Sequence, residues 1–191
     1  MAKADPDASK RERSKTIRWV VTIFFVTILI SGVISLVSDE VMANSSLIVA
    51  FLILFVIIFL GIIFDIIGMA VATASEKPFH SMAARKVPGA QEAIRLLRNA
   101  ERVSSICNDV VGDICGVVSG SASATIAALI LTNAEIGWPR GVSLAMSALA
   151  AGLTVGGKAI GKTFAVKSCT KIVHIVGWLI HSANRLFARK K

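Results

Sequence analysis

Charged residues are missing from four long stretches of this sequence, which cover residues 19–38, 41–64, 114–134 and 141–157. Each stretch approaches or exceeds the ~20 apolar residues that an α-helix needs to cross the hydrocarbon core of a bilayer. Because 54% of the 191 residues are hydrophobic, little sequence remains for a separate soluble domain. The sequence predicts an all-α fold, a polytopic membrane helical bundle with about four membrane-embedded helices and cytoplasmic amphipathic juxtamembrane helices.

The sequence is also poor in cysteine. Its three cysteines, Cys107, Cys115 and Cys169, form no C-x-x-C pair, and no two of them share a loop. Two of them lie in or beside a hydrophobic stretch, where a free cysteine behaves as a small apolar residue. This pattern argues against a disulfide or a zinc site. The sequence also has no recognisable nucleophile–base pair or metal triad, so we do not expect an enzyme.

Basic residues are in excess, and the formal net charge is +9. They gather beside the hydrophobic stretches: near the N-terminus, between Lys77 and Arg102, and from Lys158 onward. This distribution matches the positive-inside bias of membrane proteins and argues against nucleic acid as a partner. It predicts a multi-pass protein of the plasma (cell) membrane, with the lipid bilayer as its partner. Both termini are then cytoplasmic, and the loops near residues 38–45 and 132–140 are external.

The chain divides into three parts by this pattern. Residues 1–16 are polar and charged, and we interpret them as a disordered basic N-terminal tail. Residues 17–38 are a predicted N-terminal transmembrane helix, whose apolar part exceeds the 7–15 residues of the apolar region of a signal peptide. Residues 39–188 are predicted to be the main transmembrane domain with its juxtamembrane helices.

Two basic segments have the pattern of amphipathic helices. Within residues 89–102, apolar residues recur at helical spacing and arginines lie on another face. In the last segment, Lys171, His174, His181 and Arg185 share one face, and apolar residues lie largely on the other. Such helices suit the anionic cytoplasmic leaflet, and the alternative is that the last helix packs against the spans. We interpret the two histidines as interface residues.

Small residues recur at every fourth position in the third and fourth stretches. In a bilayer this small-xxx-small pattern lets two helices approach closely. We therefore expect the two spans to pack tightly against each other or across a dimer. The residues are Gly112, Gly116, Gly120, Ala148, Gly152 and Gly156.

Ionisable groups inside a membrane span are costly and are therefore functional candidates. Asp65 lies in the second apolar segment, and Asn108, Asp109 and Asp113 cluster near the start of the third. Carboxylate and amide oxygens suit a magnesium-like ion, so these four residues are candidate metal ligands. The alternative is a set of interfacial or mutually paired charges.

Residues 156–163, Gly-Gly-Lys-Ala-Ile-Gly-Lys-Thr, fit the pattern G-x-x-x-x-G-K-[ST] at every fixed position. A phosphate-binding loop needs a strand before it, a helix after it and a sheet with an acidic magnesium partner. Here a membrane-length segment comes before the match and few residues follow Thr163. We interpret the match as coincidental.

The same region resembles an element of a known family. Residues 157–165, Gly-Lys-Ala-Ile-Gly-Lys-Thr-Phe-Ala, resemble the G-E-x-x-P-K-T-x-A element of the CorC/CNNM (cyclin M-like) magnesium transporters. Residues 93–102, Ala-Ile-Arg-Leu-Leu-Arg-Asn-Ala-Glu-Arg, resemble the A-L-x-L-L-x-N-P-E-R stretch of that family. The similarity covers roughly residues 46–188, the transmembrane domain without the CBS pair. The helix at residues 17–38 is then an additional N-terminal span.

The resemblance implies a homodimer that transports divalent cations, with magnesium as the transported ion and no other cofactor. It places the cation ligands of the family near Ile67, Gly68, Cys115 and Lys158, and none of these residues keeps the ligand chemistry. Lys158 departs most sharply, because an ammonium group repels a divalent cation. Residues 157–163 are expected to form a turn after the fourth span. Regulation by CBS domains would need a separate regulatory chain.

Two functions remain open at this point. In the first, the chain is a divalent-cation transporter that uses Asp65, Asn108, Asp109 or Asp113 as substitute ligands. In the second, it is a degenerate, non-transporting member of the family that acts as a membrane scaffold or partner subunit. Lys158 then takes the place of the cation and neutralises Asp113 or Asp65, since opposite charges inside a helical bundle must pair or be hydrated.

Overall fold

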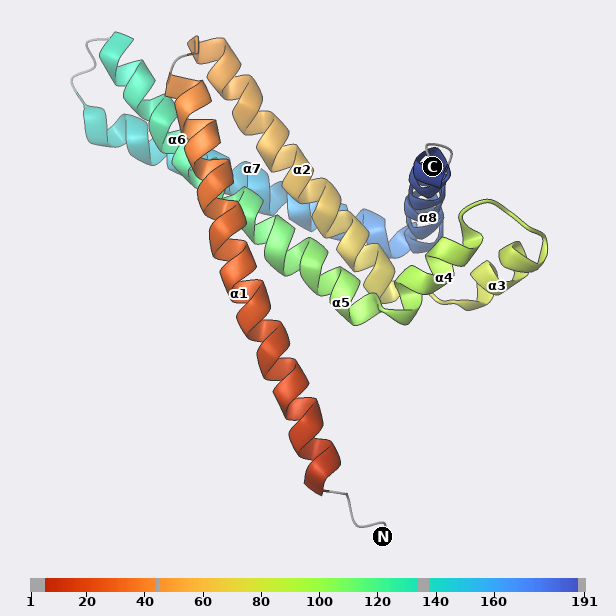
Figure 1. The fold of residues 1–191 in the computed structure, drawn as a ribbon. Helices are drawn as coiled ribbons and strands as arrows, with labels where there is room; N and C mark the ends of the chain where they lie inside the picture. The colour runs from red at the N-terminus through yellow and green to blue at the C-terminus, as the bar shows by residue number, and fades with distance from the viewer. Residues whose placement is uncertain (1–5, 44, 134–137, 189–191) are drawn as a thin grey trace.

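Every element of the structure is a helix, as the sequence predicts. The computed structural model describes residues 6–43, 45–133 and 138–188, and these ranges contain no strand. Four long helices form a bundle, and shorter helices lie at one of its ends (Figure 1). The long helices are α1 (Pro6–Ala43), α2 (Leu47–Thr73), α6 (Gly112–Asn133) and α7 (Pro139–Lys167), and the shorter ones are α3 (Lys77–Ala84), α4 (Ala90–Arg98), α5 (Ala100–Ser105), the π-helical segment η1 (Ile106–Val111) and α8 (Cys169–Ala188).

Four segments are long and apolar enough to cross a membrane: Ile17–Met42, Leu47–Thr73, Ala100–Thr132 and Pro139–Lys167. The third of them joins α5, η1 and α6. Large apolar side chains cover the outside of the bundle, and Ile48 is 79% exposed. Such continuous apolar surface is rare on soluble proteins, whereas lipid tails would cover it. The fold is an all-α bundle of the membrane-spanning type.

Segments at both ends of α1 and near the end of α7 differ from the expectations. Helix α1 begins at Pro6, so residues 6–16 continue the helix that was expected to start near residue 17, while residues 1–5 lie outside the described residues. Helix α7 continues to Lys167, so Gly157–Thr163 is helical and the predicted turn is wrong. For α7 the physical reason is that a helix satisfies its own backbone groups where lipid offers no hydrogen bonds.

Helix α2 lies at the centre of the bundle, where it packs against both α6 and α7. Its buried residues Leu54 and Ile58 belong to one apolar cluster with Ile126 of α6 and Met146 of α7. A second apolar cluster, at the end that carries the short helices, surrounds Phe79, which is completely buried. Burial of a side chain of this size contributes about 1.5–3 kcal/mol.

Close packing occurs at glycines outside the predicted small-residue pattern. Gly157 and Gly161 of α7 lie directly against Ile62 and Ile66 of α2, and a Cβ at Gly161 would lie 2.8 Å from Ile66 Cγ1. Helices α6 and α7 do pack against each other, but four of the predicted positions face open space within the chain. A Cβ would meet no atom within 4 Å at Gly116, Gly120, Gly152 or Gly156.

Helix α1 is joined to α6 by a small set of polar side chains. Asp39 Oδ1 accepts hydrogen bonds from Ser121 Oγ at 3.4 Å and from Thr125 Oγ1 at 3.3 Å. The hydroxyls of Ser35 and Ser121 are 3.3 Å apart. Asp39, which the sequence pattern placed in a loop, therefore lies in the last turns of α1 and attaches this helix to the bundle.

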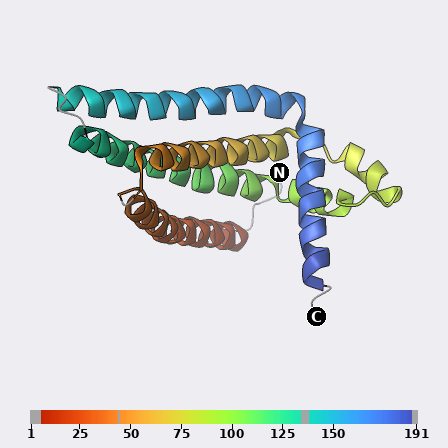
Figure 2. The ribbon, with the colours of Figure 1, turned by 90° about the horizontal axis from the view of Figure 1, so that it is seen from above.

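The short helices form a layer across the end of the bundle. Figure 2 shows α8 running crosswise to the long helices, with α3 on its far side, and α8 packs against α4. Gly89, with a φ of 85°, lies against the backbone of α8 at Gly177 and Trp178. A side chain at either glycine would overlap the backbone of the other helix, so the two helices approach as closely as their backbones allow. The predicted amphipathic helix at the C-terminus is confirmed, and it packs against the rest of the chain.

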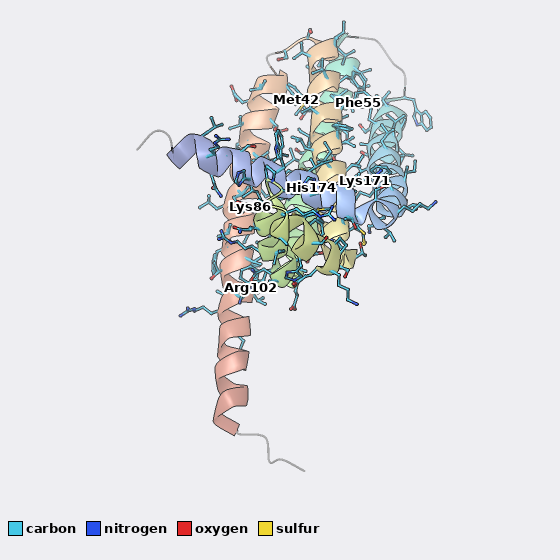
Figure 3. All side chains as sticks on the ribbon, turned by 90° about the vertical axis from the view of Figure 1, so that its right-hand side faces the viewer. Met42, Phe55, Lys86, Arg102, Lys171 and His174 are labelled. Carbon is cyan, nitrogen blue, oxygen red and sulfur yellow. The ribbon has the colours of Figure 1, made fainter. Side chains whose placement is uncertain are left out.

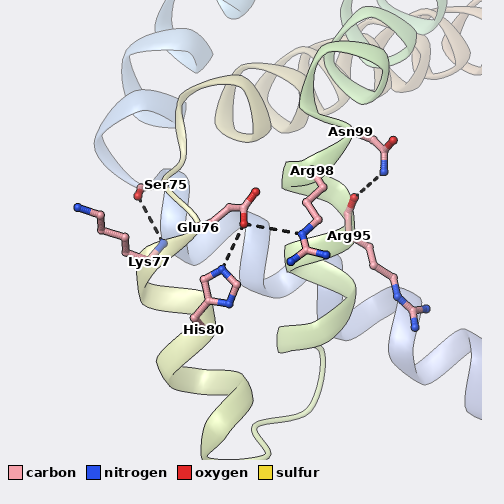
Figure 4. Close-up of polar contacts among 7 residues, drawn as sticks. All are labelled: Ser75, Glu76, Lys77, His80, Arg95, Arg98 and Asn99. Carbon is pink, nitrogen blue, oxygen red and sulfur yellow. Dashed lines mark hydrogen bonds and ion pairs between the residues drawn. The ribbon is translucent and has the colours of Figure 1, made fainter.

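Polar contacts order the α3–α4 hairpin on its exposed side. Glu76 Oε2 lies 3.2 Å from His80 Nε2 and 3.9 Å from Arg98 Nε, and Asn99 donates to the carbonyl of Arg95 at 3.0 Å (Figure 4). Because these side chains are largely exposed, the ion pairs contribute little to stability. The apolar cluster around Phe79 holds this layer together.

The contact between α4 and α8 is expected to weaken in acid. His181 Nδ1 donates to Glu92 Oε1 at 2.9 Å, and the Glu92 side chain is only 15% exposed. Burial raises the pKa of Glu92, but the hydrogen bond to His181 and nearby positive charge outweigh it, so the pKa lies below its ordinary value of 4.5. The resulting stability is present above pH 4.5 and is lost as the pH falls through the lowered pKa.

We expect Glu92→Gln to remove this part of the acid sensitivity. The difference in unfolding free energy between wild type and variant should be about 1 kcal/mol at neutral pH and should shrink below pH 4.5. Thermal unfolding of both proteins in detergent between pH 6 and pH 3 measures it. Parallel pH profiles would contradict the assignment to Glu92.

Candidate functional site

Helices α2, η1 and α7 bring three of the predicted site residues to one level inside the bundle. Asp65 lies on the face of α2 between Gly61 and Gly68. A Cβ at Gly61 would lie 2.9 Å from Cys115 Cβ, and a Cβ at Gly68 would overlap the Asn108 side chain. Asp65 therefore faces the segment between Asn108 and Cys115. Asp65, Asn108 and Lys158 are here termed the interior polar site.

Asp65 is an ionisable residue in the apolar interior. It is only 4% exposed, and its Oδ2 is buried without a hydrogen-bond partner among the described residues. A buried carboxylate that lacks hydrogen bonds is costly, and natural proteins rarely leave such a group unsatisfied. Its position in a membrane-type span makes it a functional candidate.

Asn108 presents a second oxygen of the same kind. Its Nδ2 donates to Ser104 Oγ at 3.3 Å, whereas its Oδ1 is buried and has no partner among the described residues. The Oδ1 occupies the space that a side chain at Gly68 would fill. Asn108 belongs to η1, and a π-helical turn within a longer helix often marks a functional site. The oxygen therefore faces α2 close to Asp65, about one helical turn along that helix.

Lys158 enters the site from α7. Its Nζ donates to the carbonyl oxygen of Gly112 at 3.2 Å. Lys158 lies between Gly157 and Gly161, the two residues that meet α2 on either side of Asp65. Within the described residues the ammonium has no carboxylate within 4.0 Å. The expected neutralisation of Asp65 or Asp113 by an ion pair with Lys158 is therefore not found.

Two of the predicted ligands lie away from this site. Asp109 and Asp113 are exposed, and Asp109 accepts a hydrogen bond from Ser105 Oγ at 2.6 Å. Asp109 follows Asn108 directly in η1, so its side chain points to a different side of the helix. No cluster of three or more histidine, cysteine, aspartate or glutamate side chains that could hold a metal ion occurs among the described residues.

The positions at which the resemblance places the cation ligands of the family have different surroundings. Gly68 lies against the Asn108 side chain and so is at the edge of the interior polar site. Ile67 packs against the apolar cluster around Phe79. Cys115 is a free cysteine that packs against Gly61. Sequence reasoning found Asp65, Asn108 and Lys158 but missed the Gly112 carbonyl. A backbone oxygen leaves no signal in the residue pattern.

The histidines of α8 do not form a shared site. His174 Nε2 is buried without a hydrogen-bond partner among the described side chains, and His181 bonds to Glu92. Both side chains are partly buried, and their interpretation as interface residues on the wet face of an interfacial helix stays a prediction.

An apolar groove of about 1090 Å³ lies between α2 and α7, on the outside of the bundle. Only isoleucine, leucine, valine, phenylalanine and glycine line it, and the exposed Phe55 is one of them (Figure 3). No polar group is available there to orient a ligand. The groove suits the tails of surrounding lipids.

Comparison with known proteins identifies no relative: no family model, no curated protein and no solved structure matches this chain. The class of protein therefore follows from the fold, which is all-α with four helices that could span a membrane. Within that architecture the interior polar site is the place where ionisable chemistry is buried.

Proposed function

We propose that this chain transports a divalent cation, with Mg²⁺ as its cargo, in the manner of the CorC/CNNM proteins that its sequence resembles. One observation carries the proposal: Asp65 Oδ2 and Asn108 Oδ1 are both buried and lack hydrogen-bond partners among the described residues. Two such oxygens on facing helices are suited to a cation that exchanges hydration for protein ligands.

The chemistry of these groups fits the cargo. Mg²⁺ prefers oxygen ligands, keeps several of its waters and is usually bound through one or two carboxylates. Asp65 would supply the carboxylate, Asn108 an amide oxygen, and the bound waters would fill the other positions. A third oxygen, the Gly112 carbonyl, lies four residues after Asn108 in the chain, and Lys158 already donates to it.

Lys158 then acts as a fixed positive charge close to the transported Mg²⁺. Its bond to the Gly112 carbonyl keeps the ammonium off Asp65, so the carboxylate stays available. Its positive charge weakens the binding of Mg²⁺, and a transported ion must leave its site as well as enter it. We infer that Lys158 lowers the affinity of the site.

The second candidate is a non-transporting member of the family that acts as a scaffold or partner subunit. The observation that favours it is the ammonium group of Lys158, which already occupies a backbone oxygen, the Gly112 carbonyl, at the interior polar site. In that function the lysine takes the place of the cation permanently. The homodimer, the separate regulatory chain and the cytoplasmic termini in a plasma membrane remain predictions in both cases.

Transport is tested with the full chain in proteoliposomes that contain a Mg²⁺-sensitive dye. We expect wild type to admit Mg²⁺ and Asp65→Asn to reduce the rate about tenfold or more, because the only buried carboxylate among the described residues loses its charge. Asp113→Asn is the matched control, since this aspartate is exposed, and it should keep the rate within about twofold.

No flux through wild type, with protein that is folded and inserted, would contradict the proposal and favour the scaffold. Equal losses in the Asp65 and Asp113 variants would show that general charge rather than the interior polar site governs the rate.

A further inference from the structure

A cavity lined by two arginines lies where α1 leaves the bundle. It has a volume of about 420 Å³ and is lined by Arg18, Trp19 and Thr22 of α1 and by Arg102 of α5. Figure 1 shows α1 leaning away from α5 toward its N-terminal end, and Figure 3 shows Arg102 beside α1. The cavity therefore separates the first span from the rest of the bundle.

The two arginines in this cavity have no anionic partner among the described side chains. Neither Arg18 nor Arg102 has a carboxylate within 4.0 Å among the described side chains, and both are exposed. The Arg102 guanidinium lies over the Trp19 ring, 5.6 Å from its centroid. This cation–π contact fixes the planar group without using its N–H donors. Two positive charges are thus held in one concave space with their donors available.

The depth of the cavity in a bilayer follows from the spans. Arg18 is the second residue of the segment Ile17–Met42, and Arg102 is the third residue of Ala100–Thr132. Both arginines lie at the same end of the bundle, where the apolar segments begin and lipid headgroups are found. Tryptophan and arginine are typical of this level, and basic pockets between spans bind lipid headgroups.

We propose that this cavity binds the phosphate of an anionic phospholipid headgroup, with Arg18 and Arg102 as its two ligands. A guanidinium presents two parallel N–H donors that match phosphate oxygens. Thr22 lines the same space, although its hydroxyl donates to the Arg18 carbonyl at 2.8 Å. The lipid fills the gap between α1 and α5 and ties the first span to the bundle at the end opposite Asp39.

The test is a titration of the full chain in detergent with phosphatidylglycerol, with the first bound lipid followed by native mass spectrometry. We expect Arg18→Ala and Arg102→Ala each to weaken this first binding about tenfold, which corresponds to roughly 1.4 kcal/mol. Arg185→Ala is the matched control: it removes an exposed arginine from α8, and binding should change less than about twofold.

Arg102→Lys keeps the charge but not the planar fork, and binding should still weaken, whereas a purely electrostatic attraction would leave it unchanged. Phosphatidylcholine should bind more weakly than phosphatidylglycerol, because its choline group is cationic. Three results would each overturn the proposal: equal effects of the Arg18, Arg102 and Arg185 variants, wild-type binding by Arg102→Lys, or displacement of the lipid by millimolar inorganic phosphate.

Discussion

Replacing Lys158 with glutamate is expected to raise the affinity of the interior polar site for Mg²⁺ on the order of 100-fold. The substitution removes the positive charge that lies on the Gly112 carbonyl and adds a carboxylate. At an effective dielectric constant of about 20, one unit charge at 4 Å contributes roughly 4 kcal/mol. The expected gain is well below the sum for two charge units, because water and the flexible side chain screen the charge.

Lys162→Glu is the matched control for this experiment. Lys162 lies one turn further along α7 and is exposed, so the same change in charge occurs outside the interior polar site. Isothermal titration of the detergent-solubilised proteins with MgCl₂ compares the two. An equal rise in affinity in both variants would mean that overall charge, rather than the position of Lys158, sets the affinity.

Gly89→Ala is expected to lower the free energy of unfolding by about 3 kcal/mol, the sum of two separate costs. The φ of 85° at Gly89 is a left-handed conformation that costs a side-chain-bearing residue roughly 1–2 kcal/mol. The new Cβ would also overlap the backbone of α8 at Trp178, and overpacking of this kind costs about 1–3 kcal/mol. Because the contact is with backbone, no side-chain rotation relieves it.

Gly116→Ala provides the comparison for Gly89→Ala. Gly116 lies inside α6, and a Cβ there would meet no atom within 4 Å. Alanine is favoured over glycine in a helix by roughly 0.5–1 kcal/mol, so this variant should be as stable as wild type or slightly more stable. Thermal unfolding and hydrogen exchange of the α8 amides measure both variants. Rapid exchange confined to α4 and α8 in Gly89→Ala would locate the damage, and unchanged exchange there would contradict the packing described.

The four spans were predictable because their signal is local. Apolar stretches of membrane length and the basic residues beside them predict each long helix, and the structure confirms all four. The amphipathic pattern after Lys167 likewise predicts α8. These features depend on composition and helical periodicity, which a sequence carries directly.

The ends of the spans were less predictable, because neighbouring helices decide them. The family resemblance implied a turn at Gly157–Thr163, yet α7 continues, and its Gly157 and Gly161 lie against Ile62 and Ile66 of α2. A glycine that lowers helix propensity here permits close packing. Its effect depends on a partner that is almost a hundred residues away in the sequence.

The site was predicted in part for a related reason. Asp65 and Asn108 were found because polar residues in spans are conspicuous, but the same rule also selected Asp109 and Asp113, which face outward. The rule identifies residues that are energetically costly inside a span, but it does not indicate which way their side chains point. Which residues share a face with α2 follows from the packing of Gly68 against Asn108, and no spacing within the third span indicates that partner.

Mg²⁺ binding to the purified wild-type chain tests the central claim most directly, since it asks whether the interior polar site accepts a cation while Lys158 is present. Isothermal titration, repeated with Asp65→Asn and Asp113→Asn, gives the answer. The proposal predicts saturable binding by wild type and by the Asp113 variant, and loss of binding in the Asp65 variant. Binding by Lys158→Glu alone, with none by wild type, would contradict it and assign the chain to the non-transporting alternative.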